Sequence, residues 1–106
     1  MAVWRYAGSL DDVWAGEMTA VNLGAAADVL LCNLDGTLVA YEDRCPHLAS
    51  PLSGGALDGG VLTCGAHEWQ FDARTGRGVN PASVCLRRYP VRLDGEQIFV
   101  DLREDE

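Results

Sequence analysis

The 106-residue chain lacks lysine altogether, and it has only two histidines, His47 and His67. All eight basic residues are arginine, against sixteen acidic residues, which leaves a formal net charge of −8. Because nucleic acids and anionic membrane surfaces both attract a basic face, this charge argues against either as a partner. It favours protein partners with basic docking patches, although an ordinary role in solubility explains the charge equally well.

The chain also lacks a long apolar run, and none approaches the ~20 residues that a membrane-spanning helix needs. Its first residues show no apolar core of a signal peptide, so we expect a cytoplasmic protein. Thiols in that compartment stay reduced or bind metal instead of forming disulfides. The chain has no Gly-x-Gly-x-x-Gly motif, so it offers no recognisable site for a nicotinamide or flavin cofactor. The length predicts a single domain, 1–106.

Short β-prone runs separated by turn residues predict an all-β fold. Asp-Gly pairs join two pairs of runs, and glycine accepts the positive φ that a tight type I′ hairpin turn requires. A third turn, Asp58-Gly59-Gly60, precedes a short strand at 61–63, and Ser9 is placed to cap the only helix-like turn. The two expected hairpins consist of 29–34 with 37–41 and of 91–93 with 97–100. Strands of this length predict a small antiparallel sandwich or barrel.

Both histidines lie in short motifs that begin with a cysteine, Cys45-Pro46-His47 and Cys64-Gly65-Ala66-His67. Two thiolates and two imidazoles, delivered in pairs by two loops, suit a [2Fe–2S] cluster in which histidines replace two cysteines on one iron. They also suit a Cys2His2 zinc site, although zinc knuckles usually place at least two residues between their ligands. The turn-rich segment 44–84 holds both motifs, and we interpret it as a subdomain inserted between the two hairpins.

The two motifs and their surroundings resemble the Rieske ferredoxin pattern. The resemblance implies a Rieske iron–sulfur protein fold in which Cys45 and Cys64 bind one iron of a single [2Fe–2S] cluster and His47 and His67 bind the other. Neutral imidazoles in place of two thiolates make the oxidised cluster neutral, so it accepts an electron more readily than a cluster with four thiolates. Rieske potentials accordingly lie at roughly −150 to +300 mV, against about −400 mV for plant-type ferredoxins.

The residues beside the ligands point to a ferredoxin and not to a respiratory Rieske protein. Respiratory members have a further cysteine in each ligand loop, joined as a disulfide, and hydroxyl side chains near the cluster sulfurs. In this chain Ser50 and Ala66 stand at the cysteine positions, and Trp69 and Phe71 stand at the hydroxyl positions. Fewer hydrogen bonds to sulfur stabilise the reduced cluster less. The resemblance therefore implies a potential at the low end of the Rieske range.

Two further residues are candidates for contact with an electron-transfer partner. Trp69 follows the second ligand motif, where an aromatic side chain either contacts a partner or simply packs. Pro81 ends the stretch 76–81, which resembles the loop that covers the cluster in Rieske domains. Cys32 and Cys85, by contrast, lie in expected strands with no histidine nearby, so we expect both thiols to be buried and inert.

The function implied is that of an electron carrier and not of an enzyme. A Rieske oxygenase adds a mononuclear iron held by two further histidines and a carboxylate, and this chain has no histidine to spare. Stretches at 10–18 and 59–64, together with Asn80-Pro81, resemble the Rieske ferredoxins of bacterial four-component diiron monooxygenases of the toluene 4-monooxygenase type. In that family the ferredoxin passes single electrons from an NADH-dependent flavin reductase to a diiron hydroxylase that oxidises a hydrocarbon.

Three alternatives to this function stay open. The ferredoxin of a ring-hydroxylating dioxygenase has the same cluster but a different terminal oxygenase. The small subunit of a nitrite reductase has a similar fold but often lacks the ligands. A zinc-binding interaction module, from a different class of function, would use the same four side chains. The colour of the purified protein separates the last alternative, because an iron–sulfur cluster is red-brown and zinc is colourless.

Replacing a predicted histidine ligand by cysteine tests the ligand assignment. The His67→Cys substitution exchanges a neutral imidazole for a thiolate, so we expect a cluster that assembles to have a markedly lower reduction potential. Voltammetry of the wild type and the variant measures the difference, and His47→Cys tests the second ligand of the same iron. An unchanged potential in both variants would show that other side chains bind the cluster.

Overall fold

The computed structural model describes residues 4–24, 28–44, 52–65, 69–80 and 84–102. Within these ranges the chain forms three antiparallel sheets and two short turns of 3-10 helix, which confirms the expected all-β fold. No helix in the described ranges has the length and apolarity that a membrane crossing demands.

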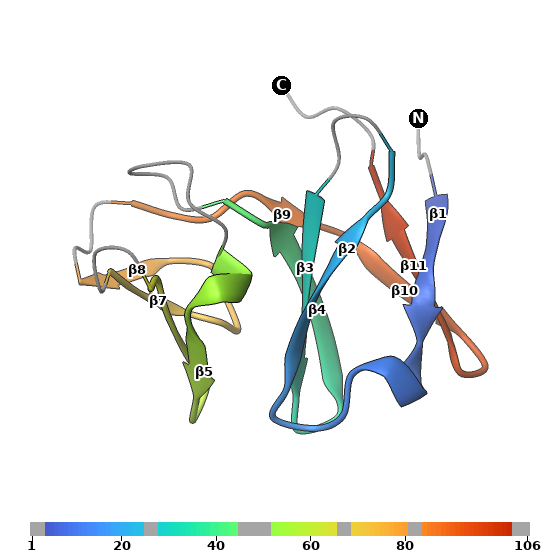
Figure 1. The fold of residues 1–106 in the computed structure, drawn as a ribbon, viewed down its shortest axis with the longest axis horizontal. Coiled ribbons are helices and arrows are strands. Elements are labelled where there is room, and N and C mark those ends of the chain that lie inside the picture. The colour runs from blue at the N-terminus through green and yellow to red at the C-terminus, as the bar shows by residue number, and fades with distance from the viewer. Residues whose placement is uncertain (1–3, 25–27, 45–51, 66–68, 81–83, 103–106) are drawn as a thin grey trace.

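The strands form a row of three sheets, with the sheet β2-β3-β4-β9 between the sheet β1-β11-β10 and the sheet β5-β6-β7-β8 (Figure 1). We call them the central, first and third sheets. Their elements are β1 Trp4–Ser9, η1 Leu10–Asp12, β2 Met18–Asn22, β3 Asp28–Leu34, β4 Thr37–Glu42, η2 Leu52–Gly54, β5 Ala56–Asp58, β6 Val61–Thr63, β7 Gln70–Asp72, β8 Gly78–Asn80, β9 Arg88–Tyr89, β10 Val91–Asp94 and β11 Gln97–Asp101. The third sheet lies inside the segment 44–84, whose bounds as a subdomain stay a prediction, as does the single domain over 1–106.

The strand β3 buries side chains on both faces of the central sheet. Leu30 and Cys32 belong to the apolar cluster shared with the third sheet, whereas Val29 and Leu31 belong to the cluster shared with the first sheet. All four residues are at most 1% exposed. Successive side chains of a strand point to opposite faces, so a strand buried on both sides shows an unbroken apolar run in the sequence. The central sheet is therefore the common wall of two cores.

The two Asp-Gly hairpins close with different turns. The loop between β3 and β4 consists of Asp35 and Gly36, whose φ angles of 59° and 101° are both positive, as a type I′ turn requires. The loop between β10 and β11 is shifted by one residue and consists of Gly95 and Glu96. Only Gly95 has a positive φ there, of 62°, so the expected type I′ geometry is wrong and the pattern is that of a type II′ turn.

Ser9 caps the single turn η1, as expected from the sequence. The Ser9 hydroxyl accepts a hydrogen bond of 3.3 Å from the Asp11 N–H, and the Ser9 N–H donates one of 2.9 Å to Oδ2 of Asp12. This reciprocal pair satisfies N–H groups that a helix start leaves without an intrahelical partner. The predicted turn before β6 is confirmed as well, since Gly59 and Gly60 have φ angles of 60° and 84°.

The two cysteines outside the metal motifs have different surroundings. Cys32 is buried as expected, and burial, followed by the nearby charge of Asp43, raises the pKa of its thiol to about 12. Cys85 is exposed, so the expectation that it is buried is wrong. Its neighbour Leu86 packs into the core beside the third sheet, and alternation along extended chain then directs Cys85 outward.

Tyr41, on β4, ties the central sheet to the third sheet. Its buried hydroxyl donates a hydrogen bond of 2.7 Å to the carbonyl oxygen of Ala73. A Cβ atom at Gly76 would lie 2.8 Å from Cε1 of the tyrosine ring, and the φ of Gly76 is +81°, so the position requires glycine. Burial raises the pKa of Tyr41 from 10.0 to about 12. One aromatic side chain thus fixes the turn between β7 and β8.

Replacing Tyr41 by phenylalanine removes this hydrogen bond while keeping the ring. We expect Tyr41→Phe to lower the free energy of unfolding by about 1–3 kcal/mol at neutral pH, because the Ala73 carbonyl loses its buried donor. The wild type should also lose stability between pH 10 and about 12, since its pKa is raised in the folded state and the unfolded tyrosine ionises first. Urea unfolding across this pH range should show a shallower loss in the variant. Equal stability of both proteins at neutral pH would contradict the role of the bond.

Candidate metal centre

The structure describes two of the six residues predicted for the site. Cys64 and Trp69 lie in the described ranges, whereas Cys45, His47, His67 and Pro81 lie outside them. The described residues on either side of the two ligand motifs are well defined by their contacts. The segments that enter and leave each motif therefore define the described part of the site.

The second ligand motif occupies the hairpin loop between β6 and β7. Thr63 and Gln70 are the last paired residues of the two strands, and the Cys64 N–H donates a hydrogen bond of 2.7 Å to the Trp69 carbonyl oxygen. The Cys64 side chain has no exposed surface, and it belongs to the apolar cluster between the central and third sheets. The hairpin therefore places the Cys64 side chain in a closely packed part of the core that is shielded from water.

The first ligand motif follows the last strand residue of β4, and the chain returns to the core at Leu52. The Asp43 N–H donates a hydrogen bond of 3.0 Å to the Asp28 carbonyl oxygen at the start of β3. The side chain of Leu52 is fully buried in the same apolar cluster as Cys64. The two segments are also bonded to each other, since the carboxylate of Asp43 accepts hydrogen bonds of 2.8 Å from both N–H and Oγ of Ser53.

Close backbone contact at two glycines brings the segment that follows the first motif against the start of the second motif. A Cβ atom at Gly55, just after the first motif, would collide with the Thr63 carbonyl oxygen and lie 3.0 Å from the Gly65 nitrogen. A Cβ atom at Gly65, inside the second motif, would lie 2.8 Å from the Gly54 carbonyl oxygen. Side chains at either position would force the segments apart. Because glycine has no side chain, the backbones of these two segments can approach this closely.

A third segment runs beside the second motif. The Gly78 N–H donates to the Val84 carbonyl oxygen and the Leu86 N–H donates to the Gly76 carbonyl oxygen, each at 2.7 Å, so residues 76–78 lie beside residues 84–86. Pro81 lies outside the described residues. Trp69 is half-buried and packs against the cluster between the central and third sheets. The packing interpretation of Trp69 is thus supported, and its contact with a partner stays a prediction.

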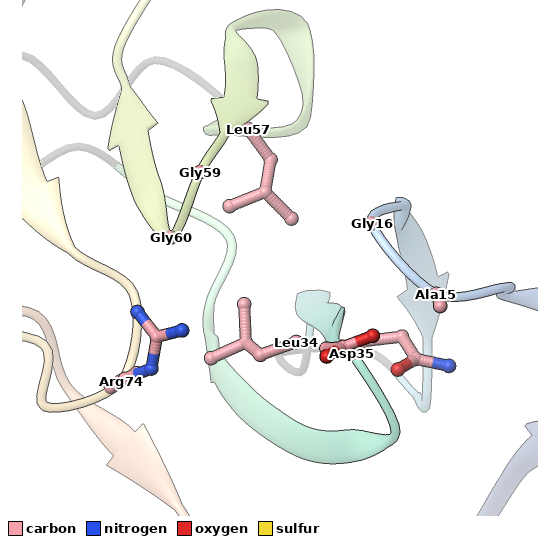
Figure 2. Close-up of a pocket in the computed structure, with 9 residues that line it drawn as sticks. Ala15, Gly16, Leu34, Asp35, Leu57, Gly59, Gly60 and Arg74 are labelled. Carbon is pink, nitrogen blue, oxygen red and sulfur yellow. The ribbon is translucent and has the colours of Figure 1, made fainter.

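A cavity of about 310 Å³ opens at the other end of β6, away from Cys64. Figure 2 shows Leu34 and Leu57 directed toward its centre and Arg74 along one side. Neither Cys64 nor Trp69 lines it. The strand β6 places about 13 Å between Gly60, which lines this cavity, and Cys64, at the usual rise of an extended chain. The cavity is therefore separate from the metal centre.

Two motifs that each supply one thiolate and one imidazole match the donor set of a [2Fe–2S] cluster with mixed ligands. The family model of the Rieske [2Fe–2S] domain matches residues 3–90 of the chain. The chain belongs to the Rieske [2Fe–2S] family. This Rieske protein carries a [2Fe–2S] cluster, and its relatives identify it as a ferredoxin, an electron carrier and not a catalytic subunit.

The relatives are ferredoxin components of oxygenase systems. The ferredoxin component of an alkene monooxygenase system from Xanthobacter autotrophicus is 42% identical over 93 residues, which are 87% of this chain and 75% of the relative. The biphenyl dioxygenase ferredoxin subunit of a Pseudomonas species is 40% identical over 95 residues, which are 88% of this chain and 86% of the relative. A chain in the complex of reduced oxygenase and oxidised ferredoxin in carbazole 1,9a-dioxygenase is 28% identical, with a TM-score of 0.89 and coverage of 98% of this chain and 97% of that one.

The residues that hold the loops of the Rieske protein were not found from its sequence. Asp43 and Ser53 stand ten positions apart, and nothing in the sequence pairs one acidic residue with one of several serines. The glycines at 54, 55 and 65 read as ordinary turn residues. Two adjacent glycines follow one ligand motif and a single glycine lies inside the other. This pattern was the available signal for the contact, because glycine often marks close approach of two backbones.

Replacing Gly55 by alanine tests the contact between the two loops. We expect Gly55→Ala to lower the free energy of unfolding by about 1–3 kcal/mol and to reduce the iron content, because the new Cβ meets the Thr63 carbonyl group. Gly54→Ala is the matched control: a Cβ there meets no atom within 4 Å, so it should stay within about 0.5 kcal/mol of the wild type. Urea unfolding and iron assay measure both effects. Equal behaviour of the two variants would rule out the contact as the cause.

Proposed function

We propose that this Rieske ferredoxin carries single electrons from an NADH-dependent flavin reductase to the diiron hydroxylase of a hydrocarbon monooxygenase. The observation that carries the proposal is the 42% identity with the ferredoxin component of an alkene monooxygenase system. The chain needs both partners, because it has no nicotinamide or flavin motif and no histidine beyond the two in its metal motifs. We further propose that it acts in the cytoplasm and that its partners present basic docking surfaces to its net charge of −8.

The cluster ligands in this proposal are Cys45, His47, Cys64 and His67. The cluster, when bound, supplies a site that gains and loses one electron at a Rieske-type potential. Full burial of Cys64 keeps its sulfur away from water, and the 2.7 Å bond between Cys64 N–H and the Trp69 carbonyl oxygen closes the loop around it. A ligand shell held by packed backbone rearranges little when charge is added, which favours fast transfer in both directions.

A dioxygenase system is the second candidate. The biphenyl dioxygenase ferredoxin is 40% identical to this chain, close to the value for the monooxygenase ferredoxin. The carbazole dioxygenase complex holds a ferredoxin together with its oxygenase, so that fold can dock on a terminal oxygenase. In either system the ferredoxin would have the same cluster, ligands and role. Only the receiving iron site would differ, and it belongs to the partner.

Reconstitution with both kinds of oxygenase distinguishes the two candidates. The purified ferredoxin, a flavin reductase and NADH would be mixed with a diiron alkene monooxygenase hydroxylase or with a biphenyl dioxygenase terminal oxygenase. We expect NADH-dependent substrate oxidation with the diiron hydroxylase, measured as oxidised alkene formed per NADH consumed. Mixtures without the ferredoxin give the background. Turnover with the dioxygenase alone would overturn the monooxygenase proposal in favour of the second candidate.

A further inference from the structure

One side-chain pair joins the two described segments that flank the first ligand motif. Oδ1 of Asp43 accepts a hydrogen bond from the Ser53 N–H and Oδ2 accepts one from the Ser53 Oγ, both at 2.8 Å. Both oxygens of one carboxylate are thus used by a single residue ten positions away. We call this pair the Asp43–Ser53 clasp.

Each side of the clasp is fixed to the body of the protein. The Asp43 N–H is bonded to the Asp28 carbonyl oxygen on the central sheet. On the other side, the Gly55 N–H donates a 2.9 Å hydrogen bond to the Leu52 carbonyl oxygen, and the Leu52 side chain is fully buried. The clasp therefore joins two segments that are each bonded or packed to the rest of the protein, and it fixes the distance between them.

The clasp differs from an ordinary helix cap in the length of chain that it closes. The pair Ser9 and Asp12 on η1 uses the same two residue types, but its partners are only three positions apart and close a single turn. Asp43 and Ser53 close a loop of ten positions, which has more conformational freedom to lose. Hydrogen bonds to a carboxylate are stronger than hydrogen bonds between neutral groups, so the pair can keep the two ends of such a loop together.

We propose that the Asp43–Ser53 clasp is a positioning device for the cluster: it holds together the two segments that flank the first ligand motif and thereby slows loss of iron. This inference rests on the proposed ligation by Cys45 and His47, which lie two and four positions after Asp43. Separation of the two flanking segments would release the stretch that carries both of these proposed ligands. Local opening of a loop needs much less free energy than global unfolding, so the clasp controls cluster lifetime more than overall stability.

The test compares three variants of the cluster-loaded protein. Ser53→Ala removes the Oγ donor, Ser53→Thr keeps a hydroxyl, and Ser9→Ala removes the matching hydroxyl from the remote η1 turn. Loss of visible absorbance in excess iron chelator measures cluster release, and far-UV circular dichroism in the same samples reports the fold. Hydrogen exchange at the Gly55 N–H reports opening beside the clasp, with amides of β3 as the reference.

We expect Ser53→Ala to lose its cluster about ten- to a hundredfold faster than the wild type, as the loss of one hydrogen bond to a charged group, of roughly 1.5–3 kcal/mol, would give. The Gly55 amide should exchange faster in this variant while β3 amides do not change. Ser53→Thr and Ser9→Ala should release the cluster at the wild-type rate. Equal rates in Ser53→Ala and Ser9→Ala would overturn the proposal. The ligand assignment fails separately, if the His47→Cys and His67→Cys potentials are unchanged.

Discussion

Burial of both faces of the central sheet is the constraint on which the rest of this structure depends. The strand β3 carries apolar side chains at consecutive positions, and Leu30, Leu31 and Cys32 are at most 1% exposed. At about 25 cal/mol for each Å² of apolar surface removed from water, neither face can stay open to solvent. The first sheet covers one face and the third sheet covers the other. The metal centre is thus attached to a core that the central sheet creates.

The path from this core to the ligand loops is short. Leu52 and Cys64 belong to the same buried cluster as Leu30, so the segment after the first ligand motif and the start of the second motif are parts of the core itself. Backbone contact at Gly55 and Gly65 and the Asp43–Ser53 clasp add the remaining constraints. An electron carrier benefits from this arrangement, because a preorganised ligand shell has little to rearrange when its charge changes.

Features governed by local chemistry were predictable from the sequence. The hairpin at Asp35-Gly36 and the cap at Ser9 follow from conformational preferences of neighbouring residues, and the structure confirms both. The type of cluster belongs here too, since the identity and spacing of the cysteines and histidines restrict the metal, whereas their assignment as the four ligands stays a prediction. The Rieske family and the ferredoxin role were inferred from these residues, and the comparisons with known proteins support them.

Features that depend on pairing between distant segments were not predictable. The turn at Gly95 has the type II′ pattern because pairing of β10 with β11 shifted its loop by one residue, and Cys85 is exposed because its neighbour Leu86 occupies the core. By itself the sequence determined the all-β fold, the type of cluster and the class of carrier, since these follow from residue types and short spacings. Only the tertiary structure decided how the ligand loops are held, because the contacts at Asp43, Ser53, Gly55 and Gly65 join segments that meet only after the sheets have packed.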